Sequence, residues 1–176
     1  MDIKIELPLT AEKAAQLRAG DTVKLSGIIY TARDAAHKRL VAALDAGTPL
    51  PVELQDQTIY FAGPCPAPPG RPIGSAGPTT SGRMDAYSPR LIRECGLRGM
   101  IGKGERNQAV IDAMQECGAV YLATTGGAGA LIAQAIKAAE VVAFEDLGPE
   151  AIRKLTVEDF PAIVAIDAHG GNLYKR

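Results

Sequence analysis

The sequence lacks several features that would each have pointed to a particular class of protein. It has no tryptophan and only 5% aromatic residues, so its core must be built mainly from alanine, valine, isoleucine and leucine. No apolar run approaches the roughly 18 residues of a membrane-spanning helix, so we expect no membrane span. The formal net charge is −1 with both signs dispersed, which does not indicate nucleic acid as a partner.

Cysteine usage and the N-terminal residues exclude two further classes. Cys65, Cys95 and Cys117 are an odd number at wide spacing, and they form no CxxC or histidine-containing metal motif. We interpret them as free thiols in a reducing compartment. Met1 to Leu9 lacks the basic and then apolar pattern of a secretory leader. These patterns predict a cytoplasmic protein whose own residues hold no metal.

The 176 residues predict a single α/β domain that covers the whole chain, 1–176. Its first half looks mixed, whereas strands and helices alternate after residue 97, which predicts parallel strands with helical crossovers. Expected strands lie at 2–9, 21–30, 58–62, 98–102, 119–123, 141–144 and 163–167. Expected helices lie at 11–19, 31–47, 83–95, 107–117, 128–137 and 149–154. The predicted helix caps are Thr10, Thr31 and Asn107, and the predicted stops are Gly20, Gly47, Gly96 and Gly118.

The most distinctive stretch is the segment 74–85, GSAGPTTSGRMD, at the end of a proline-rich region. Residues 63–78 hold six prolines and four glycines, and a long loop inside a compact domain is more often functional. Glycine, proline and two adjacent hydroxyls suit a tight loop that opens a helix, where N–H groups and a guanidinium converge. The segment therefore predicts an anion site at a helix N-terminus. Of Thr79 and Thr80, we expect one to cap the helix and the other to face a ligand.

Three cations follow predicted strands or open predicted helices, namely Arg33, Arg83 and Lys103. Ligands of open α/β sheets gather at the carboxyl ends of strands, and arginine can grip a carboxylate with two hydrogen bonds. The three cations therefore suit a substrate with more than one carboxylate, although each one alone could be a solvated surface residue. His37 lies one helical turn after Arg33, where it is either a substrate contact or a partly buried structural residue.

Two glycine-rich turns raise the alternative of nucleotide binding. Gly102-Lys103-Gly104 is not a P-loop, because the upstream glycine and the following hydroxyl are missing. The turn at 126–129 matches a dinucleotide fingerprint only in part, and a tight strand-to-helix turn is the favoured explanation. A threonine that acts as a base needs a strong positive field or a metal, and this chain offers no metal site. This gap indicates that the chain supplies only part of a larger site.

Several motifs, taken in order, resemble the β subunit of class I, iron–sulfur-dependent fumarate hydratase. The similarity covers nearly the whole chain, and it is carried by TARDAAHKR (31–39), GPCP (63–66), GSAGPTTSGRMD (74–85), GMIGKG (99–104), EDLG (145–148) and VEDFP (157–161). The related tartrate dehydratase β subunit shares the Arg-Asp, Gly-Pro-Thr-Thr and Gly-Lys-Gly elements. The motifs at 31–37 and 79–85 look closer to the fumarase version.

The resemblance implies a three-layer swivelling β/β/α domain and the reversible hydration of fumarate to L-malate. It implies an α subunit as partner in an α2β2 assembly, with a [4Fe-4S] cluster bound by three cysteines of that subunit. Arg33, Arg83 and Lys103 match the family's substrate-carboxylate ligands, and Thr79 matches its proposed base at C3 of malate. Thr80, Gly77 and His37 complete the candidate site.

Two alternatives to fumarate hydration stay open at the level of sequence. A tartrate or methylfumarate-type dehydratase β subunit would use the same cations for a different 2-hydroxy dicarboxylate. A non-catalytic module would use the Gly/Thr/Arg loop only to bind a dicarboxylate. An encoded α partner with three cluster cysteines would favour the enzyme.

Overall fold

The computed structural model describes residues 2–64, 67, 69–74, 77–124 and 129–175. Cys65 and residues 126–128 of the predicted dinucleotide-like turn at 126–129 lie outside these residues. The strands are β1 (Ile3–Glu6), β2 (Thr22–Thr31), β3 (Thr58–Tyr60), β4 (Gly99–Gly102), β5 (Val120–Ala123), β6 (Ile136–Ala143) and β7 (Ile152–Ile166). The helices are α1 (Ala11–Ala15), α2 (Asp34–Ala46), α3 (Ser88–Cys95), α4 (Gln108–Cys117) and α5 (Gly129–Ala135), with 3₁₀ helices η1 (Ser81–Met84) and η2 (Glu145–Glu150).

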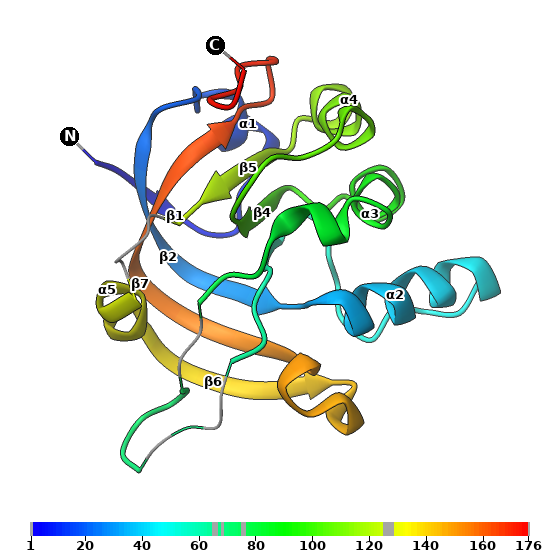
Figure 1. Cartoon of the computed structure of the whole chain (residues 1–176), viewed down its shortest axis with the longest axis vertical. Helices are drawn as coiled ribbons and strands as arrows, with labels where there is room; N and C mark the ends of the chain where they lie inside the picture. The colour runs from blue at the N-terminus through cyan, green and yellow to red at the C-terminus, as the bar shows by residue number, and fades with distance from the viewer. Residues whose placement is uncertain (1, 65–66, 68, 75–76, 125–128, 176) are drawn as a thin grey trace.

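The strands form one seven-stranded mixed sheet in the order β1-β2-β3-β4-β5-β7-β6. Strands β1 to β5 pair in parallel, whereas β7 is antiparallel to β5, β6 and β2. The β2–β7 pairing runs from Thr22 opposite Ile163 to Thr31 opposite Arg153, and Figure 1 shows these two long curved strands side by side. Because β7 pairs with both β5 and β2, strands β2, β3, β4, β5 and β7 close into a ring.

The core divides into two clusters on opposite faces of the strands. On β5, Val120 and Leu122 point into the cluster enclosed by the curved sheet, and Tyr121 points into the cluster under the helices. This period-2 alternation is what a strand buried on both faces requires. Helices α2, α3 and α4 cover one side of the sheet (Figure 1). Two layers of strands and one layer of helices thus give the three-layer α/β architecture that was expected.

The parallel unit β4-α4-β5 confirms the βα alternation predicted after residue 97. Asn107 caps α4 as predicted, its Oδ1 accepting a hydrogen bond from the N–H of Val110, and Gly118 ends this helix. The prediction of parallel strands is wrong for β6 and β7, which run antiparallel. Local sequence cannot report strand direction, and here tertiary pairing with β2 determines it.

The largest correction concerns the region 145–166. A short helix was expected at 149–154, but the 3₁₀ helix η2 ends at Glu150 and β7 already begins at Ile152. Strand β7 is 15 residues long, whereas only 163–167 was predicted as strand. The run of charges at 153–159 interrupts the apolar alternation and conceals the strand, which pairing with β2 stabilises along its length.

Helix boundaries also differ from prediction, and the helix expected at 128–137 already ends at Ala135, where β6 follows. Thr31 is the buried last residue of β2, and its Oγ1 accepts a hydrogen bond from the N–H of Arg153 at 3.2 Å instead of capping a helix. Helix α1 keeps its Thr10 cap but ends at Ala15, so Gly20 is not its stop. The helix expected at 83–95 is divided into η1 and α3, because Pro89 is tolerated only in a first turn.

Within the part of the chain that the structure describes, no helix is long and apolar enough to cross a bilayer.

Candidate functional site

The candidate site lies where β2, β3 and β4 end at one edge of the sheet. These neighbouring strands are parallel, so their carboxyl ends share that edge. Arg33 follows β2, and Lys103 follows β4. The N–H of Thr79 donates to the carbonyl of Phe61 just after β3, at 2.7 Å. Thr80 then forms a parallel bridge with Lys103, so main-chain contacts insert the threonine pair between the extensions of β3 and β4.

Arg33 and Arg83, which are 50 positions apart in the sequence, meet at Asp34. The Nε of Arg83 donates to Oδ2 of Asp34 at 2.8 Å, and the Nε of Arg33 lies 3.9 Å from Oδ1 of the same carboxylate. The Arg33 side chain is 26% exposed and that of Arg83 is 55% exposed. The structure therefore brings together two of the three predicted cations.

Gly63, just after β3, leaves room for the side chain of Arg33. A Cβ atom at position 63 would lie 2.9 Å from Cδ of Arg33 and 3.1 Å from the carbonyl oxygen of Pro149. Real Cβ atoms essentially never approach so closely, so the absence of a side chain leaves room for the arginine. The glycine of the GPCP motif thus has a steric role, because it makes room for Arg33, a candidate substrate-binding residue.

The other predicted residues differ in their exposure. Lys103, Thr80 and Gly77 are exposed, and Thr79 is half-buried. Within the described residues, the hydroxyls of both threonines and the ammonium of Lys103 make no hydrogen bond, so these groups stay available to a ligand. The expectation that one threonine caps a helix is wrong: Thr80 takes the N-cap position of η1 without a side-chain hydrogen bond. Helix η1 has only four residues, so the site depends on side-chain cations more than on a helix dipole.

His37 is fully buried, which fits the structural interpretation of this residue. Its Nδ1 lies 2.8 Å from the carbonyl oxygen of Arg33, so Nδ1 carries the proton and donates it. The ring packs edge-on against Phe61, with 5.4 Å between centroids. Burial lowers the pKa of His37 from 6.5 to about 4, so the ring is neutral at pH 7. His37 thereby supports the start of α2, directly behind Arg33.

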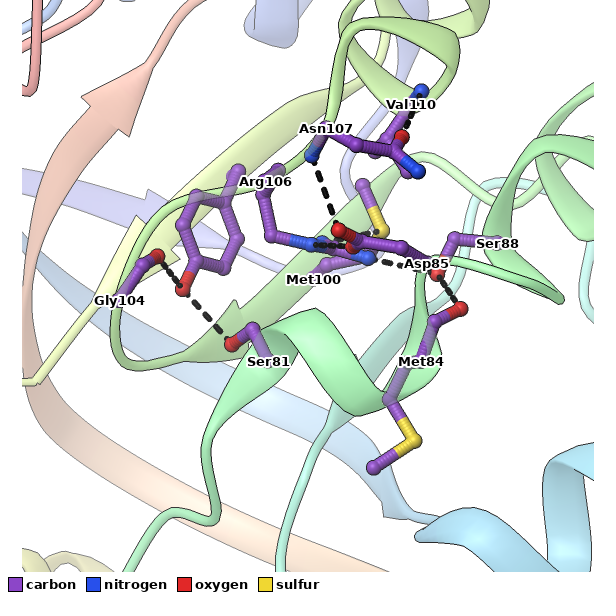
Figure 2. Close-up of polar contacts among 10 residues, drawn as sticks. Ser81, Met84, Asp85, Ser88, Met100, Gly104, Arg106, Asn107 and Val110 are labelled. Atoms are coloured by element: carbon purple, nitrogen blue, oxygen red, sulfur yellow. Dashed lines mark hydrogen bonds and ion pairs between the residues drawn. The ribbon is translucent and has the colours of Figure 1, made fainter.

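A buried ion pair between Asp85 and Arg106 connects the segment that carries Arg83 to the segment that carries Lys103 (Figure 2). The Nε of Arg106 donates to Oδ1 of Asp85 at 2.6 Å, and its Nη2 donates to Oγ of Ser88 at 2.7 Å. The second oxygen of Asp85 accepts the N–H of Asn107 at 2.9 Å. The guanidinium lies over the rings of Phe61 and Tyr121, 5.1 and 5.0 Å from their centroids. Asp85 closes the Arg83 segment and Arg106 follows Lys103, so this pair fixes the two segments relative to each other.

Ser81 is the second anchor of the loop. Its Oγ is hydrogen-bonded to the hydroxyl of Tyr121 at 2.7 Å, and its N–H donates to the carbonyl of Lys103 at 2.9 Å. A Cβ at Gly102 would lie only 1.9 Å from this Oγ, so β4 needs glycine there for the loop to approach. Sequence reasoning did not assign roles to Ser81, Asp85, Arg106 or Tyr121. Asp85 lies in the quoted motif, but no local pattern marks Arg106 as buried.

The start of α2 receives its missing cap from η2. Arg33 takes the N-cap position and provides no side-chain hydrogen bond to the helix, while Oε1 of Glu150 accepts the N–H of Ala35 at 3.1 Å. Arg39 and Asp146 form a two-hydrogen-bond ion pair between α2 and η2. The EDLG motif thus has a structural role, because it attaches η2 to the helix that carries Arg33 and Asp34.

Within the described residues, no group of three histidine, cysteine, aspartate or glutamate side chains is placed to hold a metal. Cys95 and Cys117 are free thiols at the ends of α3 and α4. The pKa of the Cys95 thiol is raised, chiefly by burial. A raised pKa disfavours the thiolate that a metal would need. The described residues therefore do not fit an iron–sulfur cluster.

In this arrangement, cationic and hydroxyl groups lie at the carboxyl edge of parallel strands. Such an edge is typical of α/β domains that bind anions. Comparison with known proteins identifies the family: the Fumarase C-terminus family matches residues 1–176, and the chain belongs to it.

Individual relatives share much of the sequence. The chain is 44% identical to "Fumarate hydratase class I, anaerobic" of Escherichia coli (strain K12) over 163 residues, which cover 92% of this chain and 30% of that protein. It is 38% identical to "Fumarate hydratase 2" of Leishmania major over 177 residues, covering 100% of this chain and 31% of that protein. It is also 38% identical to "Putative L(+)-tartrate dehydratase subunit beta" of Methanocaldococcus jannaschii, covering 95% of this chain and 88% of that protein. The chain thus spans less than a third of these two fumarate hydratases and most of the tartrate dehydratase subunit.

Proposed function

We propose that this chain is the β subunit of a two-subunit class I fumarate hydratase and supplies half of its active site. The observation that supports this proposal is the meeting of Arg33 and Arg83 at Asp34, in a member of the Fumarase C-terminus family in which Thr80 also bridges to Lys103. The reaction is the reversible hydration of fumarate to L-malate. Its substrate carries two carboxylates, which matches a site built around three cations.

Recognition of the substrate divides between the cations. Arg83 uses its Nε for Asp34, so its two Nη groups remain for a bidentate grip on one carboxylate. Arg33 and Lys103 bind the other carboxylate and the oxygen atoms nearby. Gly77 and Thr80 border the substrate with main-chain and hydroxyl groups, and His37 contributes by holding the carbonyl of Arg33.

Thr79 is the group that handles the proton at C3 of malate. A threonine hydroxyl is a weak base at its ordinary pKa, so it requires a positive field and exclusion of water. Arg83 is 55% exposed in this chain, and an exposed cation loses most of its field to solvent. A second polypeptide that covers this edge would remove the water and complete the site. This physical requirement supports an α partner, for which we propose an α2β2 assembly in the cytoplasm.

The cofactor in this proposal is a [4Fe-4S] cluster on the α subunit, which would act as a Lewis acid toward the substrate hydroxyl when bound. The described residues of this chain include no group that would hold it. The roles derived for this chain are therefore limited to binding the carboxylates, orienting the substrate and moving the C3 proton at Thr79.

The test is co-expression with the α partner under anaerobic conditions, followed by an assay of fumarate hydration. We expect Thr79→Val to lower kcat by about 100-fold or more, the usual contribution of a positioned acid–base group, with assembly intact. Thr79→Ser keeps the hydroxyl and serves as the matched control, with most of the activity retained. If Thr79→Val stays within about threefold of wild type, the proposed role of the hydroxyl is wrong.

A tartrate dehydratase β subunit is the second candidate, and the 88% coverage of the Methanocaldococcus jannaschii relative favours it. Comparing kcat/KM for malate, tartrate and mesaconate with the assembled complex separates the candidates. A higher value for tartrate than for malate would assign the chain to that reaction. Binding of a dicarboxylate without turnover of any of the three would instead indicate a non-catalytic module.

A further inference from the structure

The carboxylate of Asp34 lies between the two arginines of the candidate site. Its Oδ2 accepts the Nε of Arg83 at 2.8 Å, while its Oδ1 faces the Nε of Arg33 at 3.9 Å, too far for a hydrogen bond. That Oδ1 and that Nε are both buried and have no hydrogen-bond partner in the described part of the chain. Buried polar atoms are almost always paired, so this gap is exceptional.

The contact with Asp34 determines which edge of the Arg83 guanidinium remains free. A guanidinium offers its donors in a fixed planar fork, and engaging Nε leaves the end that carries both Nη groups. The Arg83 side chain is more than half exposed and makes no other hydrogen bond within the described residues. Without Asp34, Arg83 would have no defined orientation, and ordering it would oppose ligand binding.

We propose that Asp34 is a positioning residue for dicarboxylate binding, an inference that rests on the proposed function. Asp34 aims the free edge of Arg83 at one substrate carboxylate. It also ties Arg83 to the segment that carries Arg33, which binds the other carboxylate. The distance between the two grips is thereby set by one short side chain at the start of α2, so Asp34 contributes to the choice of a four-carbon dicarboxylate.

A simpler electrostatic view predicts the opposite result. A carboxylate beside two arginines partly cancels their charge, and removing it should then strengthen the binding of an anion. A positioning role predicts weaker binding once Asp34 is neutral, because the arginines lose their shared anchor. The sign of the change in affinity therefore distinguishes the two.

The experiment uses the assembled complex and two readouts, steady-state kinetics and calorimetric binding of succinate, a dicarboxylate that is not hydrated. We expect Asp34→Asn to raise KM and the succinate Kd about tenfold, with a smaller change in kcat. Asp45→Asn is the matched control, since Asp45 pairs with Arg90 at the other end of α2, and we expect both values unchanged. In an Arg83→Lys background, which lacks the Nε donor, Asp34→Asn should have little further effect.

The outcomes separate the two proposals. Tighter or unchanged succinate binding in Asp34→Asn would overturn the positioning role while leaving the proposed function intact. Failure of the wild-type complex to bind succinate or turn over malate would contradict the proposed function itself. Should Asp34→Asn not fold, which circular dichroism would reveal, Asp34→Ser must give the same weakening for the inference to stand.

Discussion

The buried pair of Asp85 and Arg106 gives the sharpest test of the scaffold under the site. In Asp85→Asn the side chain keeps its size and loses its charge, so the Arg106 guanidinium remains buried without a counter-charge. The Arg106 side chain is 0% exposed, and that of Asp85 is 13% exposed. The pKa of Arg106 is lowered, chiefly by burial. Burial therefore already disfavours the charged form of this guanidinium in the wild type.

The expected cost follows from where the pair lies. Breaking a buried ion pair from one side costs about 3–5 kcal/mol, because the remaining charge stays desolvated. Arg106 retains Ser88 as an acceptor and the faces of two aromatic rings, and such cation–π contacts are worth roughly 0.5–2 kcal/mol. These contacts already exist in the wild type and limit the loss without replacing the charge. We therefore expect Asp85→Asn to lower the free energy of unfolding by about 3 kcal/mol.

Urea unfolding followed by circular dichroism measures this cost. With a urea m-value of about 2 kcal/mol per molar, typical of a small domain, the midpoint should fall by about 1.5 M. The matched control is Glu116→Gln, which neutralises the partner of Arg93 in an exposed pair with an N–O distance of 2.9 Å. Such surface pairs contribute about 0–1 kcal/mol, so the midpoint should barely move.

A loss in Asp85→Asn no larger than in Glu116→Gln would refute this reasoning. It would mean that water or another acceptor reaches Arg106, so that the guanidinium is not held as a desolvated charge. The connection between the Arg83 and Lys103 segments would then have to depend on Ser81 and Tyr121 alone.

Two further predictions concern the same region. His37 has a pKa of about 4 when folded and an ordinary value of 6.5, so the unfolded chain takes up the proton first as pH falls. Its contribution to stability is therefore present above pH 6.5 and is lost progressively toward pH 4. Between pH 7 and pH 5 the wild type should lose about 2 kcal/mol more than His37→Gln, measured as urea midpoints at both pH values. Gly102→Ala would place a Cβ 1.9 Å from Oγ of Ser81 and should cost about 1–3 kcal/mol by overpacking. Gly82→Ala, whose Cβ meets nothing nearer than 4.0 Å, should cost far less in the same measurement, and equal losses would contradict the steric argument.

The elements that sequence predicted well are those in which local chemistry and tertiary structure agree. Helix α4 has its own Asn107 cap and a terminal Gly118, and it appears as predicted. Strand β7 was mostly missed, because charges at 153–159 interrupt its alternation and its stability comes from pairing with distant β2. Local patterns carry no information about such a partner.

The candidate site, too, was predictable where local sequence marks a residue and not where distant contacts determine its burial. Glycines and cations near strand ends indicated Arg33, Arg83 and Lys103, and the structure brings the two arginines together at Asp34. Their catalytic and binding roles stay predictions. The supporting Arg106 could not be found from sequence, because an arginine between Glu105 and Asn107 has every appearance of a solvated residue. Its burial depends on Phe61 and Tyr121, which lie far away in the sequence.

Main-chain contacts place Thr79 and Thr80 in this loop, so the position of each residue does not depend on its side chain. Thr79 is held through its N–H, Thr80 through a backbone bridge, and neither hydroxyl takes part in the attachment. A substitution at either position can therefore alter reactivity while the path of the chain is conserved. Such a loop can change the groups it displays without losing the main-chain contacts that place it. Two dehydratases with different substrates could share this one frame and diverge by exchanging only the groups it displays.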